Sequence, residues 1–177
     1  MVDRFDARYV YAGGKIGFYR STNGGESWTK TGLPEMGSVN NIKVDPSNPG
    51  WVYVVCFGKN RGLYLSKDKG TTWQKILSDD FLRGIAVDPK NSMNLYAASS
   101  SARDSGGYHS NSHGLLFTRD GGKTWKQANE GLSWPFAWCV EVDPRDPSFV
   151  FGGFNGQNFK KRQFSDVNIN TKRTSKE

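Results

Sequence analysis

The sequence has little of what disulfide-bonded and metal-binding proteins are built from. Its 177 residues include only two cysteines and two histidines. Two cysteines cannot form a disulfide framework, and no CxxC or HExxH spacing occurs, so we expect no metal site and no cofactor. Cys56 and Cys139 stand among apolar residues, which favours buried free thiols and leaves a bridge between them as the alternative.

Long apolar stretches and helical periodicity are also missing. No segment approaches the roughly 18 consecutive apolar residues of a membrane span, so no membrane partner is expected. The first ten residues, MVDRFDARYV, lack the charged start and apolar core of a signal peptide. If the chain is complete as written, we therefore expect a soluble product that is not exported by that route.

Aromatic residues and glycine are abundant, and this composition suits an all-β protein with many tight turns. The length is sufficient for one domain with a hydrophobic core. The formal charge of +7 is uneven, because residues 157–177 hold six basic residues against two acidic ones. We expect residues 1–156 to form the folded part and residues 157–177 to be a basic, disordered tail, with no nucleic-acid partner.

A twelve-residue unit occurs three times and organises the chain. The copies are GFYRSTNGGESW (17–28), GLYLSKDKGTTW (62–73) and GLLFTRDGGKTW (114–125). Each opens with a short apolar run, which predicts a buried strand. The Asn or Asp that follows can accept backbone hydrogen bonds, and the Gly after it tolerates positive φ. The Trp then begins the returning strand, so the unit predicts a self-locking β-hairpin.

A second motif repeats between these hairpins. IKVDP (42–46), IAVDP (85–89) and VEVDP (140–144) each precede a polar turn and another apolar run. One repeat therefore contains four strands, which we name a to d in chain order, and the hairpin unit joins c to d. Four antiparallel strands per repeat is the composition of a β-propeller blade. The tryptophans lie 45 and then 52 residues apart, within reach of known blade periods.

The strand count predicts an all-β fold of four-stranded antiparallel blades in an incomplete ring of about three blades. The chain supplies b, c and d of one blade, two full blades, and then a, b and a degenerate c in the stretch GQNFKK. Propellers close with about 4 to 8 blades, and an open stack leaves strand edges free. We therefore expect either a fragment of a larger propeller or closure by self-association.

The hairpin unit resembles the Asp-box, S/T-x-D-x-G-x-x-W, of the BNR-repeat β-propellers, which include sialidases, xyloglucanase-type glycoside hydrolases, sortilin-like receptors and photosystem II assembly factors. The resemblance covers residues 9 to 156, and the stretch FVFGGFNGQNFKK is similar to the endings of xyloglucanase-like propellers. It implies that the boxes are structural and lie opposite the active site. The box residues are Ser21, Asn23, Gly25, Trp28, Ser66, Asp68, Gly70, Trp73, Thr118, Asp120, Gly122 and Trp125. Asn23 departs from the pattern, because it keeps the acceptor oxygen and loses the charge.

Ligands are then expected on the face formed by the b–c and d–a connections. The longest b–c connection, Ser99 to Gly114, is longer than the repeat demands, and such loops often carry function. Its Arg103, Asp104 and His113 could orient sugar hydroxyls or act as an acid. The competing interpretation, which we favour, is a flexible surface loop rich in serine and glycine.

Two d–a connections hold further candidates. Trp134 and Trp138 precede or begin a strand a, where their rings would either stack on pyranose rings or pack between blades. Asp79 and Asp80 are adjacent, so in an extended segment they point opposite ways and cannot both serve as catalytic acids. Asp80 with Asp104 would be the alternative carboxylate pair, against the simpler interpretation of a solvated turn.

The resemblance implies a segment of a carbohydrate-active, glycoside hydrolase-like propeller. The Arg-Ile-Pro motif of sialidases is absent, and the catalytic aspartates of xyloglucanase-type enzymes have no match here, so no catalytic residue is assigned. The alternative is a non-catalytic propeller module for protein partners, of the sortilin or photosystem-assembly kind. A polysaccharide or a protein is thus the expected partner. An extracellular or periplasmic location follows only if the parent protein is a secreted glycosidase.

Overall fold

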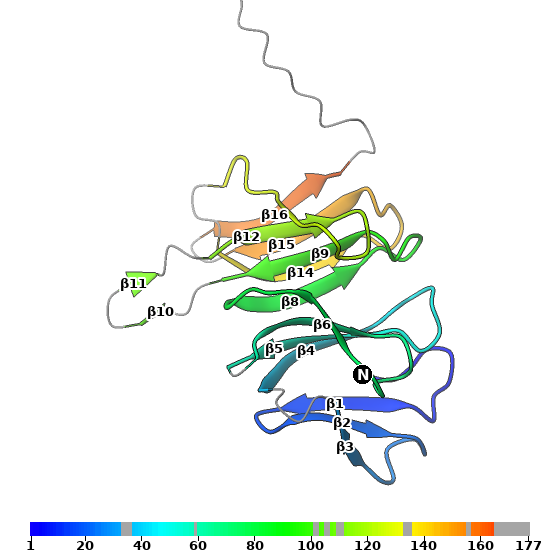
Figure 1. Cartoon of the computed structure of the whole chain (residues 1–177). Helices are drawn as coiled ribbons and strands as arrows, with labels where there is room; N and C mark the ends of the chain where they lie inside the picture. The colour runs from blue at the N-terminus through cyan, green and yellow to red at the C-terminus, as the bar shows by residue number, and fades with distance from the viewer. Residues whose placement is uncertain are drawn as a thin grey trace, which may run out of the picture.

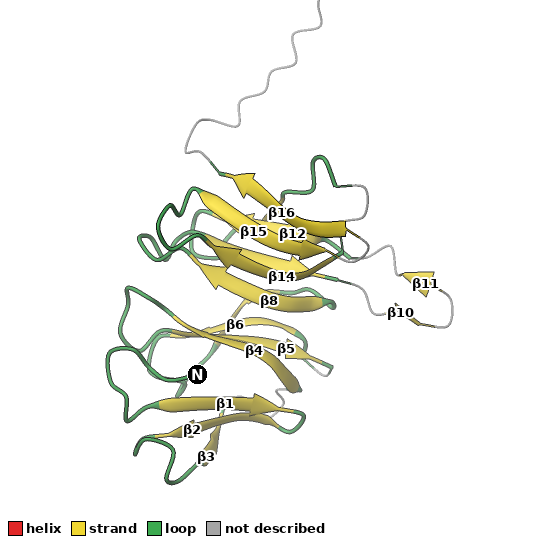
Figure 2. Ribbon diagram, turned by 180° about the vertical axis from the view of Figure 1, so that it is seen from behind, coloured by secondary structure: helices red, strands yellow, loops and turns green. Residues whose placement is uncertain are grey.

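The computed structural model describes residues 1–32, 37–58, 60–100, 103–104, 107–108, 112–132, 136–154 and 157–164. All regular structure in these ranges is β-strand, arranged as four antiparallel sheets that follow one another along the chain, with one additional small hairpin. Figure 1 shows the sheets stacked in chain order, and the reverse view in Figure 2 gives the same order. The predicted all-β propeller architecture is confirmed.

The strands of each blade pair in chain order. Blade 1 contains β1 (Val10–Gly14), β2 (Gly17–Ser21) and β3 (Thr29–Thr31). Blade 2 contains β4 (Ser38–Val44), β5 (Val52–Phe57), β6 (Gly62–Ser66) and β7 (Gln74–Leu77). Blade 3 contains β8 (Leu82–Val87), β9 (Leu95–Ser99), β12 (Gly114–Thr118) and β13 (Lys126–Gln127). Blade 4 contains β14 (Ala137–Val142), β15 (Phe149–Phe154) and β16 (Gln157–Gln163).

The hairpin of β10 (Arg103–Asp104) and β11 (Gly107–Tyr108) lies in the b–c connection of blade 3 and projects from the stack (Figure 1). We call the side that carries the b–c and d–a connections the loop face, and the side that carries the Asp-box turns the box face. Blade 4 extends through β16, so the propeller reaches seven residues past the boundary at 156 expected from the sequence.

The VDP motif caps the turn between strands a and b. Asp45 accepts the backbone N–H of Ser47 at 2.8 Å and the hydroxyl of Tyr53 at 3.1 Å. Asp3 does the same near the start of the chain, where it accepts the backbone N–H of Phe5 at 2.9 Å and the hydroxyl of Tyr11 at 3.3 Å. Val2, just before it, forms an isolated bridge with Val10. Val2 and Asp3 are therefore the end of a strand a for blade 1, which the sequence analysis missed.

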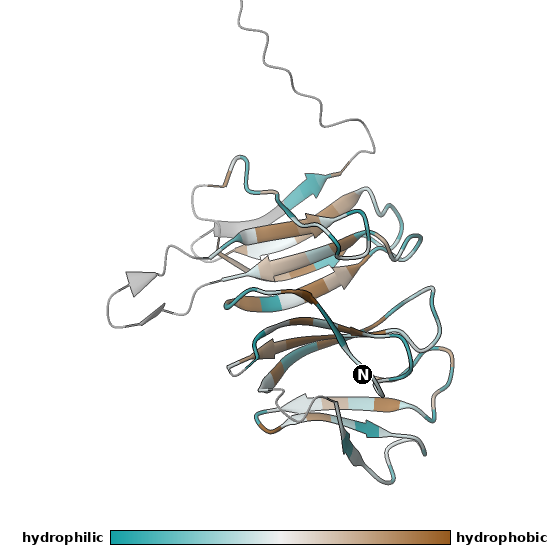
Figure 3. Ribbon diagram, in the orientation of Figure 1, coloured by the Kyte–Doolittle hydropathy of each residue, from teal (hydrophilic) through white to brown (hydrophobic). Residues whose placement is uncertain are grey.

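The hydrophobic core is divided into three parts, each lying between two successive blades. Tyr11 and Phe18 of blade 1 pack with Val52 and Val54 of blade 2. The next core joins blades 2 and 3, and the last joins blades 3 and 4. Figure 3 shows the apolar residues gathered on the strands and the polar residues on the turns. Each blade is therefore stabilised mainly by its neighbours.

The three box turns share one hydrogen-bond pattern. In the second copy the hydroxyl of Ser66 donates to Asp68 at 2.7 Å and accepts the N–H of Gly70 at 2.8 Å. Asp68 also accepts the N–H and the hydroxyl of Thr72, at 2.8 and 2.6 Å. In the first copy Asn23 accepts the N–H of Ser27 at 2.9 Å, so the amide oxygen reproduces the backbone contact.

Each box tryptophan contacts the preceding blade where one is present. Trp73 packs edge-on against Phe18, with ring centroids 5.0 Å apart. Trp125 donates its indole N–H to the carbonyl of Ile76 at 2.9 Å. Trp28 donates instead to the carbonyl of Gly25 in its own turn, and 43% of its surface is exposed. The outer side of blade 1 is therefore an uncovered blade surface.

The two cysteines are both free, and their environments differ. Cys56 is buried in β5, and burial raises the pKa of its thiol to about 12. Cys139 is exposed on β14, so the expectation of two buried thiols is wrong for this residue. Among the described residues, no helix is long and apolar enough to cross a membrane.

Candidate functional site on the loop face

Strand a of each of blades 2, 3 and 4 contains a β-bulge at the same position. The pairing with the next strand skips one residue, which is Asn40 in β4, Arg83 in β8 and Trp138 in β14. These bulges lie near the start of strand a, which is its loop-face end. A bulge leaves one residue unpaired and redirects its side chain, and bulges are common beside functional sites. We call these three residues the bulge row.

Arg83 and Trp138 of the bulge row form one stack together with Phe57. The guanidinium carbon of Arg83 lies 4.9 Å from the ring centroid of Trp138 and 5.3 Å from that of Phe57. Phe57 ends β5, so the stack joins three successive blades. Trp138 remains 46% exposed despite this contact. A large aromatic ring is thus held on the loop face and stays open to solvent.

The guanidinium of Arg83 is fixed by one hydrogen bond. Its Nε donates to the carbonyl of Ser100 at 3.2 Å. Its two terminal nitrogens have no hydrogen-bond or ion-pair partner in the part of the chain that the structure describes. Partial burial lowers the pKa of Arg83 below its ordinary value, and no carboxylate of the described residues offsets this effect.

A second polar cluster surrounds Asp79 in the d–a connection before β8. Its side chain is fully buried and accepts the backbone N–H of Phe81 at 2.7 Å and the hydroxyl of Ser99 at 3.0 Å. Its other oxygen lies 2.6 Å from Nδ1 of His113, whose side chain is 46% exposed. An ionised carboxylate only accepts, so Nδ1 carries the proton of this contact. The ring of His113 is therefore oriented on the loop face.

Asp80 lies in a different environment from its neighbour. Its side chain is 63% exposed and lies 3.5 Å from the guanidinium of Arg61. Asp79 points inward and Asp80 outward, as adjacent residues of an extended segment do. The structure thus joins Asp79 to His113 and separates both of these from Asp80.

The remaining sequence candidates are only partly placed. Trp134 lies outside the described residues. Arg103 and Asp104 form β10, and the structure describes their backbone but not their side chains. Within the described ranges, no group of three or more His, Cys, Asp or Glu side chains is arranged to hold a metal ion.

Arg83, Phe57 and Asn40 were not expected as site residues from the sequence. Each bulge residue stands four positions before the valine of the VDP motif, as the first residue of NNIKVDP, RGIAVDP and WCVEVDP. Aligning the three repeats on this motif would have placed Asn40, Arg83 and Trp138 in one column. The differing chemistry of that column is the signal that could have identified it.

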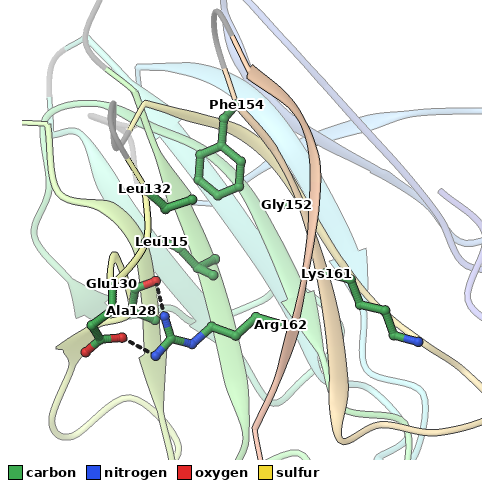
Figure 4. Close-up of a pocket in the computed structure, with 9 residues that line it drawn as sticks. Leu115, Ala128, Glu130, Leu132, Gly152, Phe154, Lys161 and Arg162 are labelled. Atoms are coloured by element: carbon green, nitrogen blue, oxygen red, sulfur yellow. Dashed lines mark hydrogen bonds and ion pairs between the residues drawn. The ribbon is translucent and has the colours of Figure 1, made fainter.

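A small cavity of about 130 Å³ opens between blades 3 and 4 (Figure 4). Leu115 and Phe154 contribute apolar surface to it. Arg162 borders it, donating to the carbonyl of Ala128 at 3.0 Å and pairing with Glu130. Arg162 and Glu130 are paired with each other, and the Lys161 side chain points away from both in Figure 4.

Comparison with known proteins places this geometry among propellers. The sequence pattern of the family described as "Sortilin-Vps10: Sortilin, neurotensin receptor 3," matches residues 17–174. A xyloglucanase from a Paenibacillus species is 30% identical over 162 residues, which cover 84% of this chain and 14% of that protein. The chain therefore spans a small part of the length of this relative.

Two solved structures are similar over most of the chain. An ancestral GH74 enzyme superposes with a TM-score of 0.71 and 25% identity, over 92% of this chain and 22% of that one. YCF48 bound to D1 peptide superposes with a TM-score of 0.55 and 22% identity, over 84% of this chain and 44% of that one. The similarity to YCF48 supports the fold alone. The chain spans less than half of either protein.

Proposed function

Because the chain belongs to the Sortilin-Vps10 family, a family of BNR/Asp-box propellers, we propose that it is a polysaccharide-binding segment of a glycoside hydrolase-like propeller. The observation that carries this proposal is the exposed ring of Trp138 on the loop face. One face of a pyranose ring presents C–H groups, and an aromatic ring can pack flat against them. Similarity to a xyloglucanase and to a GH74 enzyme supports a carbohydrate as the ligand.

Trp138 has the properties of a binding residue rather than a core residue. In the same strand Ala137 and Val140 are buried, whereas nearly half of the Trp138 surface is exposed and the adjacent Cys139 is exposed as well. The bulge sets its direction, and Arg83 packs beside its ring. A ring held in place before binding loses little conformational entropy when a sugar stacks on it.

The carboxylates described on this face support binding rather than hydrolysis by the chain alone. Inverting glycosidases need two carboxyl groups about 6.5–9.5 Å apart, with room for a water molecule. Both oxygens of Asp79 are occupied, by Phe81, Ser99 and His113, and Asp80 pairs with Arg61. We therefore propose that any catalytic pair would need acids from outside this segment.

The test is retention on immobilised xyloglucan in affinity electrophoresis. We expect Trp138→Ala to lose at least tenfold in affinity, because the stacking surface is removed. Trp28→Ala is the matched control, since Trp28 is exposed to a similar extent, 43% against 46%, and belongs to a box turn. Unchanged retention of folded Trp138→Ala, or equal losses in both variants, would contradict the proposal.

The second candidate is a non-catalytic module that binds a protein partner. YCF48, which shares the fold, has been solved with the D1 peptide bound. This candidate would be supported if the chain is not retained on any polysaccharide and binds a peptide through the same loop face. Loss of that peptide binding in Trp138→Ala would identify the surface.

A further inference from the structure

We infer that the loop face binds a carboxylate-bearing sugar, with Arg83 holding the carboxylate and Trp138 packing against the pyranose ring. This inference rests on the proposed polysaccharide binding and specifies the ligand class for the same surface. It follows from three properties of Arg83: it has no counterion among the described residues, its orientation is fixed, and it lies beside an exposed ring.

Among the described residues Arg83 has no counterion, although acidic residues are close by in the chain. Asp79 is held by three other groups, and Asp80 lies 3.5 Å from Arg61. No described carboxylate pairs with Arg83, although the residue is partly buried. A charge that is removed from water without a partner is unfavourable, and an anionic ligand would relieve that cost.

The guanidinium is also oriented before any ligand arrives. The ring centroids of Phe57 and Trp138 lie 5.3 and 4.9 Å from its guanidinium carbon, and its Nε donates a hydrogen bond to the carbonyl of Ser100. The two terminal nitrogens then remain as a planar pair of donors. Such a pair matches the two oxygens of a carboxylate in a bidentate contact, which is among the stronger and more directional hydrogen-bond arrangements.

The adjacent ring of Trp138 favours a uronic acid over an acidic peptide. In a uronic acid the carboxylate is attached directly to the pyranose ring. A single sugar unit can therefore contact the guanidinium with its carboxylate and the indole with its ring. These two groups lie 4.9 Å apart. Asn40, in the same bulge position one blade earlier, supplies a neutral amide for hydroxyls further along the chain of a polymer. The formal charge of +7 also attracts a polyanion.

The experiment compares two forms of one polymer, homogalacturonan with free carboxylates and the same polymer fully methyl-esterified. Affinity is measured by isothermal titration at about 0.15 M salt, which screens unspecific attraction. We expect the wild-type chain to bind the free acid about tenfold more tightly. Arg83→Gln should remove this preference, because it weakens binding of the free acid more than binding of the ester. Trp138→Ala should weaken binding of both forms.

Arg61→Gln is the charge-matched control. Arg61 also lies near the loop face and loses the same charge, but it already pairs with Asp80. We expect its effect to stay within twofold. Arg83→Lys keeps the charge and loses the planar donor pair, so an intermediate affinity is expected, and it replaces Arg83→Gln if that variant does not fold.

The outcomes separate the inference from the function on which it rests. Equal binding of the acid and the ester, with a loss in Trp138→Ala, overturns the carboxylate inference and leaves sugar binding intact. Equal losses in Arg83→Gln and Arg61→Gln also overturn it, since net charge would then explain the effect. Poly-glutamate binding as tight as that of the free acid would identify an acidic peptide instead. No binding of any polysaccharide would overturn the proposed function itself.

Discussion

At the scale of single residues, Asp68 illustrates how one carboxylate holds a box turn together. Partial burial raises the pKa of Asp68, but hydrogen bonds from Thr72, Ser66 and Thr71 outweigh burial and lower it to about 2. A lowered pKa in the folded state means that the contribution to stability is fully present above the unfolded value of about 4. This contribution is lost as the pH falls from about 4 towards 2.

Substitutions of Asp68 should separate its oxygen from its charge. Asp68→Ala removes the acceptor for Ser66 and Thr72, so we expect a loss of about 1 kcal/mol in the free energy of unfolding, similar to the loss of a helix N-cap. Asp68→Asn copies the natural first box with Asn23, and should cost less. Urea denaturation at pH 7 and pH 3 measures both. A larger loss for Asn than for Ala would contradict this account.

Asp79 and Asp80 provide a second test at this scale. Asp79→Ala leaves Ser99, the N–H of Phe81 and His113 without their acceptor, so we expect a loss of about 2–3 kcal/mol. Asp80→Ala removes an exposed ion pair and should change stability by less than about 0.5 kcal/mol. Thermal or urea unfolding of the two variants measures these stability losses. Similar losses in Asp79→Ala and Asp80→Ala would show that burial of Asp79 does not determine its contribution to stability.

The contrast between these two neighbours also marks what a sequence alone can predict of the site. Alternation along an extended segment predicts that Asp79 and Asp80 point opposite ways. It cannot predict which one points inward, because that depends on Ser99 and His113, which reach Asp79 from distant parts of the chain. The sequence candidates therefore included Asp80 and omitted the residue that is bound to His113.

At the scale of elements, the box turn is also a contact between blades. Gly70 and Gly25 both have positive φ, +81° and +101°, so Ala at either site introduces backbone strain of about 1 kcal/mol. A Cβ on Gly70 would lie 2.9 Å from the ring of Phe18 in blade 1. A Cβ on Gly25 would meet nothing closer than 3.8 Å.

We therefore expect Gly70→Ala to be less stable than Gly25→Ala by about 1–3 kcal/mol, the usual cost of overpacking a core. Thermal denaturation of the two variants measures this difference. Phe18→Leu in the Gly70→Ala background should restore part of the loss, because the smaller side chain makes room. Equal destabilisation by the two glycine variants would mean that the contact with the preceding blade is unimportant.

The order of strands was predictable, and the bulges were not. Apolar runs separated by turn residues fix the a-b-c-d order, because each run is long enough for one strand. A bulge arises from pairing with the neighbouring strand, and Arg83 has no local composition that marks it. Val2 and Asp3 were missed for a related reason: Arg4 stands where the other copies have proline, so the motif was incomplete.

At the scale of the whole molecule, the division of the core between blades predicts how the chain unfolds. In stacked repeats, stability is approximately a sum of nearest-neighbour terms. Phe18→Ala should weaken the core between blades 1 and 2, at a cost of about 3–5 kcal/mol to that contact. Hydrogen exchange should then rise in β1 to β3 and remain slow in β8 and β9.

Phe154→Ala is the mirror control, because Phe154 belongs to the core between blades 3 and 4. Its effect on exchange should be strongest in β14 and β15 and absent from β1 and β2. A uniform rise throughout the chain in either variant would indicate a single cooperative unit and contradict the nearest-neighbour description.

The propeller class was predictable from three boxes, since a repeated hairpin with a fixed spacing leaves few architectures. The extent of the last blade was only partly predictable: GQNFKK was expected to be a degenerate strand c, but β16 has no box after it, and its basic residues favoured a tail from residue 157. Pairing with β15, and not composition, places residues 157–163 in the sheet.

The bulge row has an evolutionary consequence. Blades 2, 3 and 4 each hold one unpaired position in an otherwise shared frame, and the frame tolerates an amide, a guanidinium or an indole there. For the polysaccharide binding proposed above, a point substitution at that position would alter ligand preference without new loops or a new register. Duplication of a blade would add one more such position, so under this proposal the range of polymers bound would grow with the number of repeats.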